Sequence, residues 1–164
     1  MKITQKKYKD NLLRIHPRVI SLLADEPITM SSLDPHWHSC INNNMLSTLL
    51  VNHPFHVIKG SDSQYLWLNP TSSHRLLLTH PAIHLHKLLI IEHTDAETSS
   101  LDDIIKTLLQ AQSALDKRNS DGFAFRSDTL FHALKRHGIK PLKKKDIATI
   151  ANCCPSNLRK GELS

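Results

Sequence analysis

The sequence predicts an α/β (α+β) fold followed by a small helical module. Two-residue alternation typical of β-strands lies in the middle of the chain, and helical apolar spacing surrounds it. A basic segment of different character follows at the C-terminal end. We therefore expect two domains, residues 1–118 and 119–164.

Composition limits the class of protein. At 164 residues with 40% hydrophobic content, the chain is long enough for one domain with a core, or for a small domain with a short appendage. It has no run of about 18 apolar residues and no apolar signal segment, so we expect no membrane partner. Its three cysteines, including the adjacent Cys153 and Cys154, give no disulfide framework, which favours a cytoplasmic location.

The first half of the chain begins with helical spacing. Residues 3–24 place apolar side chains at that spacing with Pro17 as an interruption, which predicts two short helices around the proline. The segment 25–38 contains two prolines and predicts a loop. Apolar residues on one side of 40–51 predict a helix.

The period then changes to that of strands. Residues 55–59 and 64–68 predict two strands joined by a short turn. A helix is expected to begin near Ser72 and to end before Pro81. The continuous apolar run at 86–93 predicts a buried strand.

A longer helix is expected over 100–118, where apolar residues form a clear stripe. Ser100 is expected to be its N-cap, because Asp103 follows at capping-box spacing.

The second module is predicted to begin with a helix that starts at Ser127 or Asp128 and stops at Gly138. The segment 144–160 then resembles the helix-turn-helix of bacterial repressors, which reads acid-aliphatic-Ala-x-aliphatic-small-Gly-aliphatic-Ser-Pro-Ser-x-aliphatic. The residues in register with that pattern are Asp146, Ile147, Ala148, Ile150, Ala151, Cys154, Pro155, Ser156 and Leu158. Asn152 replaces the turn glycine, and asparagine adopts the left-handed conformation better than most residues.

The charge of this region suits a polyanion. Between residues 135 and 160, eight lysines and arginines stand against a single acid, Asp146. We expect the module to bind double-stranded DNA through Lys143, Lys144, Lys145, Ser156, Asn157, Arg159 and Lys160. The alternative is a structural helix pair with a solvated basic surface.

The order of elements over 45–92 is helix, strand, strand, helix, strand, with Ser72-Ser73-His74-Arg75 between the second strand and the following helix. This order resembles the ParB N-terminal and sulfiredoxin-like superfamily, whose signature at that place is Gly-x-Arg-Arg or Gly-Cys-His-Arg. The resemblance implies a small mixed sheet with flanking helices, and phosphate binding by Ser72, Ser73, His74 and Arg75. It also implies CTP or ATP with Mg²⁺ as the ligand. A helix N-terminus favours phosphate independently, because its amides are unpaired and its dipole end is positive.

The chain departs from the signature at three points. A serine replaces the glycine, Leu76 replaces the second arginine, and Ser73 occupies the place of the sulfiredoxin cysteine. Sulfinic-acid reduction is therefore not expected. A helix whose first turn is merely solvated remains the alternative at this loop.

The twelve histidines include two His-x-His pairs, His36/His38 and His84/His86. Carboxylates are scattered and neither HExxH nor CxxC spacing occurs, so we expect no metal site.

Together these features predict a DNA-binding protein, either a transcriptional regulator or a plasmid-partition-type factor, acting as a homodimer. Two alternatives remain open. One is a nuclease or nucleotide hydrolase of the same fold, and the other is an inhibitor protein from a mobile element.

Overall fold

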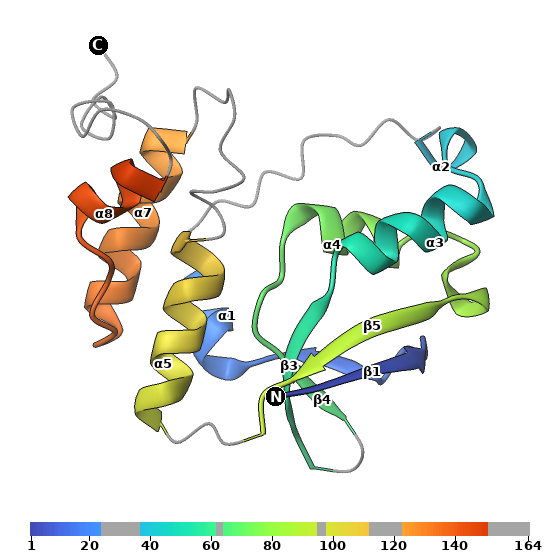
Figure 1. The fold of residues 1–164 in the computed structure, drawn as a ribbon, viewed down its shortest axis with the longest axis horizontal. Coiled ribbons are helices and arrows are strands. Elements are labelled where there is room, and N and C mark those ends of the chain that lie inside the picture. The colour runs from blue at the N-terminus through green and yellow to red at the C-terminus, as the bar shows by residue number, and fades with distance from the viewer. Residues whose placement is uncertain (24–36, 62–63, 95–97, 112–122, 151–164) are drawn as a thin grey trace. The chain divides into compact units, whose positions relative to one another are not determined.

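The computed structural model describes residues 1–23, 37–61, 64–94, 98–111 and 123–150 (Figure 1). The chain divides into two compact units. The first comprises Met1–His16 and Ile28–Ala96, and the second comprises Pro17–Pro27 and Glu97–Ser164. A five-stranded mixed sheet with helices forms the first unit, so the predicted mixed α/β class is confirmed. The boundary expected after residue 118 lies outside the described residues.

The sheet has the strand order β1-β5-β3-β4-β2. Its strands are β1 (Lys2–Lys7), β2 (Leu13–Ile15), β3 (Phe55–Lys59), β4 (Tyr65–Trp67) and β5 (Lys87–Glu92). β5 pairs antiparallel with β1 and parallel with β3, while β4 pairs antiparallel with β3 and parallel with β2. The three strands predicted between residues 55 and 93 are confirmed.

The prediction of a helix before Pro17 is wrong, because this segment forms both edge strands of the sheet. β1 pairs with β5 from Lys2↔Glu92 to Lys7↔Lys87. Ile3, one of the apolar residues at the helical spacing of residues 3–24, is 61% exposed. Lysines along β1 are typical of an edge strand, where charge discourages pairing with another chain. The helix after Pro17 is confirmed.

Helices α2 (Trp37–Cys40), α3 (Asn43–Asn52), α4 (Ser72–Leu78) and the 3₁₀ turn η1 (Ile83–Leu85) complete the first unit. The predicted helices at 40–51 and from Ser72 are confirmed. Asn42 caps α3, since its side-chain oxygen accepts the Met45 N–H at 3.0 Å. The loop expected at 25–38 lies largely outside the described residues.

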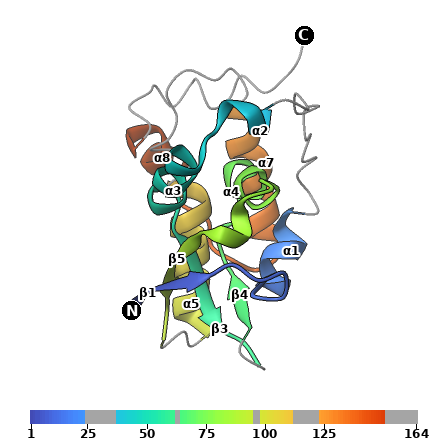
Figure 2. The same ribbon diagram turned by 90° about the vertical axis from the view of Figure 1, so that its right-hand side faces the viewer.

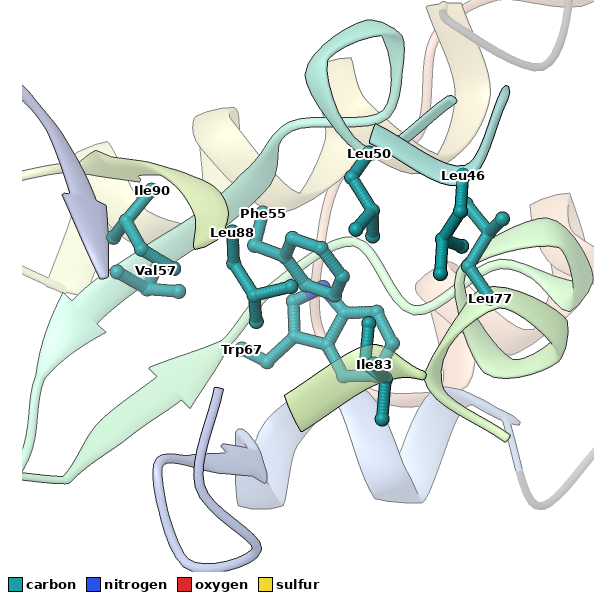
Figure 3. Close-up of a cluster of buried hydrophobic side chains, with 9 residues drawn as sticks. All are labelled: Leu46, Leu50, Phe55, Val57, Trp67, Leu77, Ile83, Leu88 and Ile90. Carbon is teal, nitrogen blue, oxygen red and sulfur yellow. The ribbon is translucent and has the colours of Figure 1, made fainter. Parts of the chain in front are cut away.

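The core of the first unit lies between the sheet and the pair α3 and α4, which lie beside each other in both views (Figure 1, Figure 2). Buried side chains on β3 alternate with half-buried ones, as expected for a strand with one covered face. The buried cluster is drawn in Figure 3 and consists of Leu46, Leu50, Phe55, Val57, Trp67, Leu77, Ile83, Leu88 and Ile90.

The described part of the second unit consists of helices. They are α1 (Pro17–Leu23), α5 (Thr98–Lys106), the π-helical turn η2 (Thr107–Ala111), α7 (Phe123–Arg136) and α8 (Lys144–Ile150). Arg18 on α1 pairs with Asp102 on α5 through two contacts, Nε to Oδ1 at 2.7 Å and Nη2 to Oδ2 at 2.8 Å. No helix in the described ranges is long and apolar enough to cross a membrane.

Two predicted helix starts are wrong. α5 begins at Thr98, so Ser100 lies inside the helix and is not its N-cap. α7 begins at Phe123, before Ser127 and Asp128, because apolar spacing continues upstream of those capping residues.

The predicted stop at Gly138 is confirmed, and its geometry is that of a Schellman motif. Gly138 has a φ of 72°. Its N–H donates to the Lys135 carbonyl at 3.2 Å, and the N–H of the buried Ile139 donates to the Leu134 carbonyl at 2.9 Å.

Candidate functional site

The loop before α4 was the first site indicated by the sequence. Thr71 is its N-cap, and the Thr71 hydroxyl oxygen accepts the His74 N–H at 3.3 Å. His74 is 2% exposed, and its ring has Nδ1 at 2.7 Å from the Thr71 hydroxyl and Nε2 at 3.2 Å from the Pro54 carbonyl. A carbonyl can only accept, so Nε2 carries the proton and Nδ1 accepts from the Thr71 hydroxyl. Neither ring nitrogen is available as the phosphate donor that we expected.

The surroundings of His74 explain its protonation state. Its ring centroid lies 4.7 Å from that of Phe55 and 5.3 Å from that of Trp67. Burial lowers the pKa of His74 from 6.5 to about 4, and the hydrogen bond to Pro54 only partly offsets this. The imidazole is therefore neutral at pH 7 and adds no charge to the loop.

The other three residues of the expected phosphate loop lie at the start of α4. Ser72 is the first helical residue and Ser73 is exposed. The Arg75 side chain is half-buried, and its backbone N–H donates to the Thr71 carbonyl at 3.1 Å. Of the four residues expected to bind phosphate, Ser73 and Arg75 are thus at least partly accessible, and the His74 ring does not contribute.

Asn69 was not singled out from the sequence, although it is the most extensively bonded polar side chain in this region. It is 1% exposed. Its Oδ1 accepts the His56 N–H and the Trp67 Nε1–H, both at 2.9 Å, and its Nδ2 donates to the Pro54 carbonyl at 3.1 Å. Asn69 therefore fixes the end of β4 to the start of β3. A polar residue just after a strand gives no local signal of such a role.

Two histidines meet on the sheet face opposite the core. Nδ1 of His56 lies 3.0 Å from Nε2 of His93, and the rings are stacked. Burial lowers the pKa of both, that of His56 to about 4 with a smaller effect from His93. Among the described residues, no three His, Cys, Asp or Glu side chains are grouped closely enough to hold a metal ion.

The second site indicated by the sequence begins at α8. The Lys143 carbonyl accepts the N–H groups of Asp146 and Ile147, at 2.9 and 3.1 Å, so Lys143 precedes the first turn. Ile147 and Ala148 are buried, while Lys143 and Lys145 are exposed. This is the arrangement expected of a helix that packs through one face and presents lysines on the other.

A hollow of about 560 Å³ lies beside these lysines on the second unit. We call it the α7–α8 hollow. It is lined chiefly by Phe131, Lys135, Ile139, Lys140, Lys143 and Lys144. The Lys144 ammonium lies 5.5 Å from the centre of the Phe131 ring, a cation–π contact that directs the side chain along the hollow. Two lysines missed by the sequence prediction, Lys135 and Lys140, thus join Lys143 and Lys144.

A buried side chain holds this region in place. Gln110 in η2 is 3% exposed, and its Oε1 accepts the Leu142 N–H at 2.7 Å. The segment between α7 and α8 is thereby tied to the helical core of the second unit. The expected base-reading residues Ser156, Asn157, Arg159 and Lys160 lie outside the described residues.

No family model, no curated protein and no solved structure matches this chain.

Proposed function

We propose that the chain binds double-stranded DNA through the second unit, as a transcriptional regulator or a plasmid-partition-type factor. The observation that carries the proposal is the convergence of Lys135, Lys140, Lys143 and Lys144 on one hollow beside α8. Lysines grouped in this way repel one another, and a DNA phosphate backbone relieves that repulsion while releasing counterions.

The burial pattern of α8 supports the same function. Ile147 and Ala148 anchor the helix, so the lysines before and within its first turn are held at a defined place rather than on a free tail. In a helix-turn-helix, the first helix lies across the phosphate backbone and the second reads bases. In this proposal Lys143, Lys144 and Lys145 contact phosphates, and Ser156, Asn157, Arg159 and Lys160 face the bases.

The first unit agrees with the ParB-like resemblance in one respect, the order of its elements. Its elements α3, β3, β4, α4 and β5 follow the chain order that the ParB-like resemblance requires. That order is also compatible with unrelated mixed sheets, so the DNA-binding proposal depends on the second unit.

The test is equilibrium binding of a labelled DNA duplex to the full chain and to the triple variant Lys143→Gln, Lys144→Gln, Lys145→Gln. Loss of three phosphate contacts should weaken binding by at least about tenfold at low salt. The matched control is Lys2→Gln, Lys6→Gln, Lys59→Gln, which removes the same charge from the first unit and should bind DNA like the unaltered chain. Equal losses of DNA affinity in both variants would mean that binding depends only on the net charge of the protein. The assignment of the DNA contacts to α8 would then be wrong.

A further inference from the structure

A second basic hollow lies entirely within the first unit, away from the α4 loop. Its volume is about 780 Å³, and five lysines line it together with Glu92. We call it the lysine hollow. The lysines are Lys2, Lys6, Lys7, Lys9 and Lys59.

The sheet register places most of these groups on one face. Lys2 is paired with Glu92, and Lys59 with Tyr65. Side chains on paired residues point to the same side, and residues two apart along a strand do so as well. Lys2, Lys6 and Lys59 therefore lie on the face that carries Val57 and the core. In Figure 3, Val57 and Ile90 lie at the opposite end of the cluster from the helix residues Leu46 and Leu77.

The remaining wall is the short connection from β1 to β2, which is hydrogen-bonded at both ends. The Tyr8 N–H donates to the His86 carbonyl at 3.3 Å, and the Leu12 carbonyl accepts the Tyr65 N–H at 2.9 Å. The Leu12 N–H also closes a turn onto the Lys9 carbonyl at 2.9 Å. The backbone that lines the hollow is thus held by its own hydrogen bonds.

The electrostatics of the lysine hollow favour an anion. None of its five lysines forms an ion pair with a carboxylate in the part of the chain that the structure describes. Five lysines line the hollow against one carboxylate, that of Glu92, which forms no ion pair with them. The excess of positive charge raises the local potential, and phosphate oxygens are strong acceptors for ammonium groups.

The other lining groups indicate what accompanies the phosphates. Glu92 would repel a ligand that is anionic throughout, and its carboxylate accepts hydrogen bonds from hydroxyl or amino groups. Asn11, Gln64 and Tyr65 add uncharged polar atoms. The volume is within the range of small-molecule sites and exceeds the need of a phosphate chain alone.

We propose that the lysine hollow binds a nucleoside polyphosphate, with the phosphate chain on the lysines and the nucleoside directed toward Glu92. This inference goes beyond DNA binding and does not depend on it. It also differs from the phosphate loop expected at Ser72 to Arg75, which belongs to another part of the first unit.

The test is calorimetric titration of the full chain with ATP, with CTP and with inorganic tripolyphosphate at one ionic strength. At least one nucleotide should bind more tightly than tripolyphosphate. The triple variant Lys2→Gln, Lys6→Gln, Lys59→Gln should weaken nucleotide binding by at least about tenfold, because three charge-assisted contacts are lost. Glu92→Gln should reduce the preference for nucleotide over tripolyphosphate.

The variant Lys143→Gln, Lys144→Gln, Lys145→Gln is the charge-matched control and should bind nucleotide like the unaltered chain. All three substituted lysines of the hollow are exposed, and thermal unfolding of each variant checks that it is folded. The proposal is overturned if neither nucleotide binds, or if tripolyphosphate binds as tightly as both nucleotides. It is also overturned if the variant of Lys2, Lys6 and Lys59 keeps its affinity for nucleotide and loses affinity only for duplex DNA. Absence of nucleotide binding does not decide the DNA test, because that test uses a different ligand and expects its loss in the variant of Lys143, Lys144 and Lys145.

Discussion

Asn69 and His74 hold the junction of β3, β4 and α4 from the inside. Both donate to the Pro54 carbonyl, at 3.1 and 3.2 Å. The sequence indicated phosphate binding for His74 because the residue falls on the signature of the ParB-like resemblance, at the start of a helix. Its burial depends on Pro54 and Phe55, which lie about twenty residues upstream, so no local pattern predicts it.

Asn69→Ala should destabilise the first unit strongly. It leaves the buried Trp67 Nε1–H and the His56 N–H without their acceptor. Each buried unsatisfied donor costs about 1–3 kcal/mol, so for two donors we expect a loss of about 2–6 kcal/mol in the free energy of unfolding. Urea denaturation measures it, with the exposed Asn44→Ala on α3 as the control. A loss equal to that of the control would show that the Asn69 bonds do not contribute.

His74 should make the stability depend on pH. Its pKa is about 4 in the folded chain and 6.5 without burial, so the unfolded chain binds more protons between these values. The free energy of unfolding should therefore fall as the pH is lowered from about 6.5 to 4, by about 2–3 kcal/mol for this residue.

The measurement is urea denaturation at several pH values for the unaltered chain and for His74→Gln, which does not titrate. The slope below pH 6.5 should be smaller in the variant, with a remainder from His56, whose pKa is also lowered to about 4. His84→Gln, at an exposed position, should keep the full slope. If His74→Gln also keeps it, the His74 ring is not the titrating group.

Among the elements, those with a local cause were predictable. The helix at 43–52 has an apolar side and a capping asparagine, and β3, β4 and β5 have strand periodicity within a few residues. β1 was not predictable, because its partner β5 lies eighty or more residues away and pairs with all six residues of β1. Tertiary pairing decided its conformation.

The end of α7 was predictable because it depends on one backbone conformation. Gly138 has a φ of 72°, and a Cβ added there would meet nothing within 4 Å. Any cost of a side chain is therefore backbone strain and not a clash. Gly138→Ala should lower the free energy of unfolding by about 1 kcal/mol, and Gly138→Asn by less, because asparagine tolerates this region. Thermal unfolding of both variants checks the order, and an alanine variant as stable as the unaltered chain would contradict it.

At the scale of the whole molecule, positive charge gathers at two separate hollows. The lysine hollow belongs to the sheet of the first unit, and the α7–α8 hollow belongs to the helices of the second. The sequence indicated only the second, because Lys143, Lys144 and Lys145 are consecutive. The five lysines of the first hollow come from β1, the β1–β2 connection and β3, and they meet only when the sheet forms. We propose that the two hollows have different anionic ligands.

The most direct test of the DNA-binding proposal is the salt dependence of duplex affinity. For the full chain, the logarithm of the association constant should fall linearly with the logarithm of salt concentration, with a slope of about −0.9 for each phosphate contacted. Replacing Lys143, Lys144 and Lys145 with glutamine should make that slope shallower by up to about three, while the first-unit variant keeps it. Absence of measurable binding at low salt, or a slope that the α8 substitutions leave unchanged, would contradict the proposal.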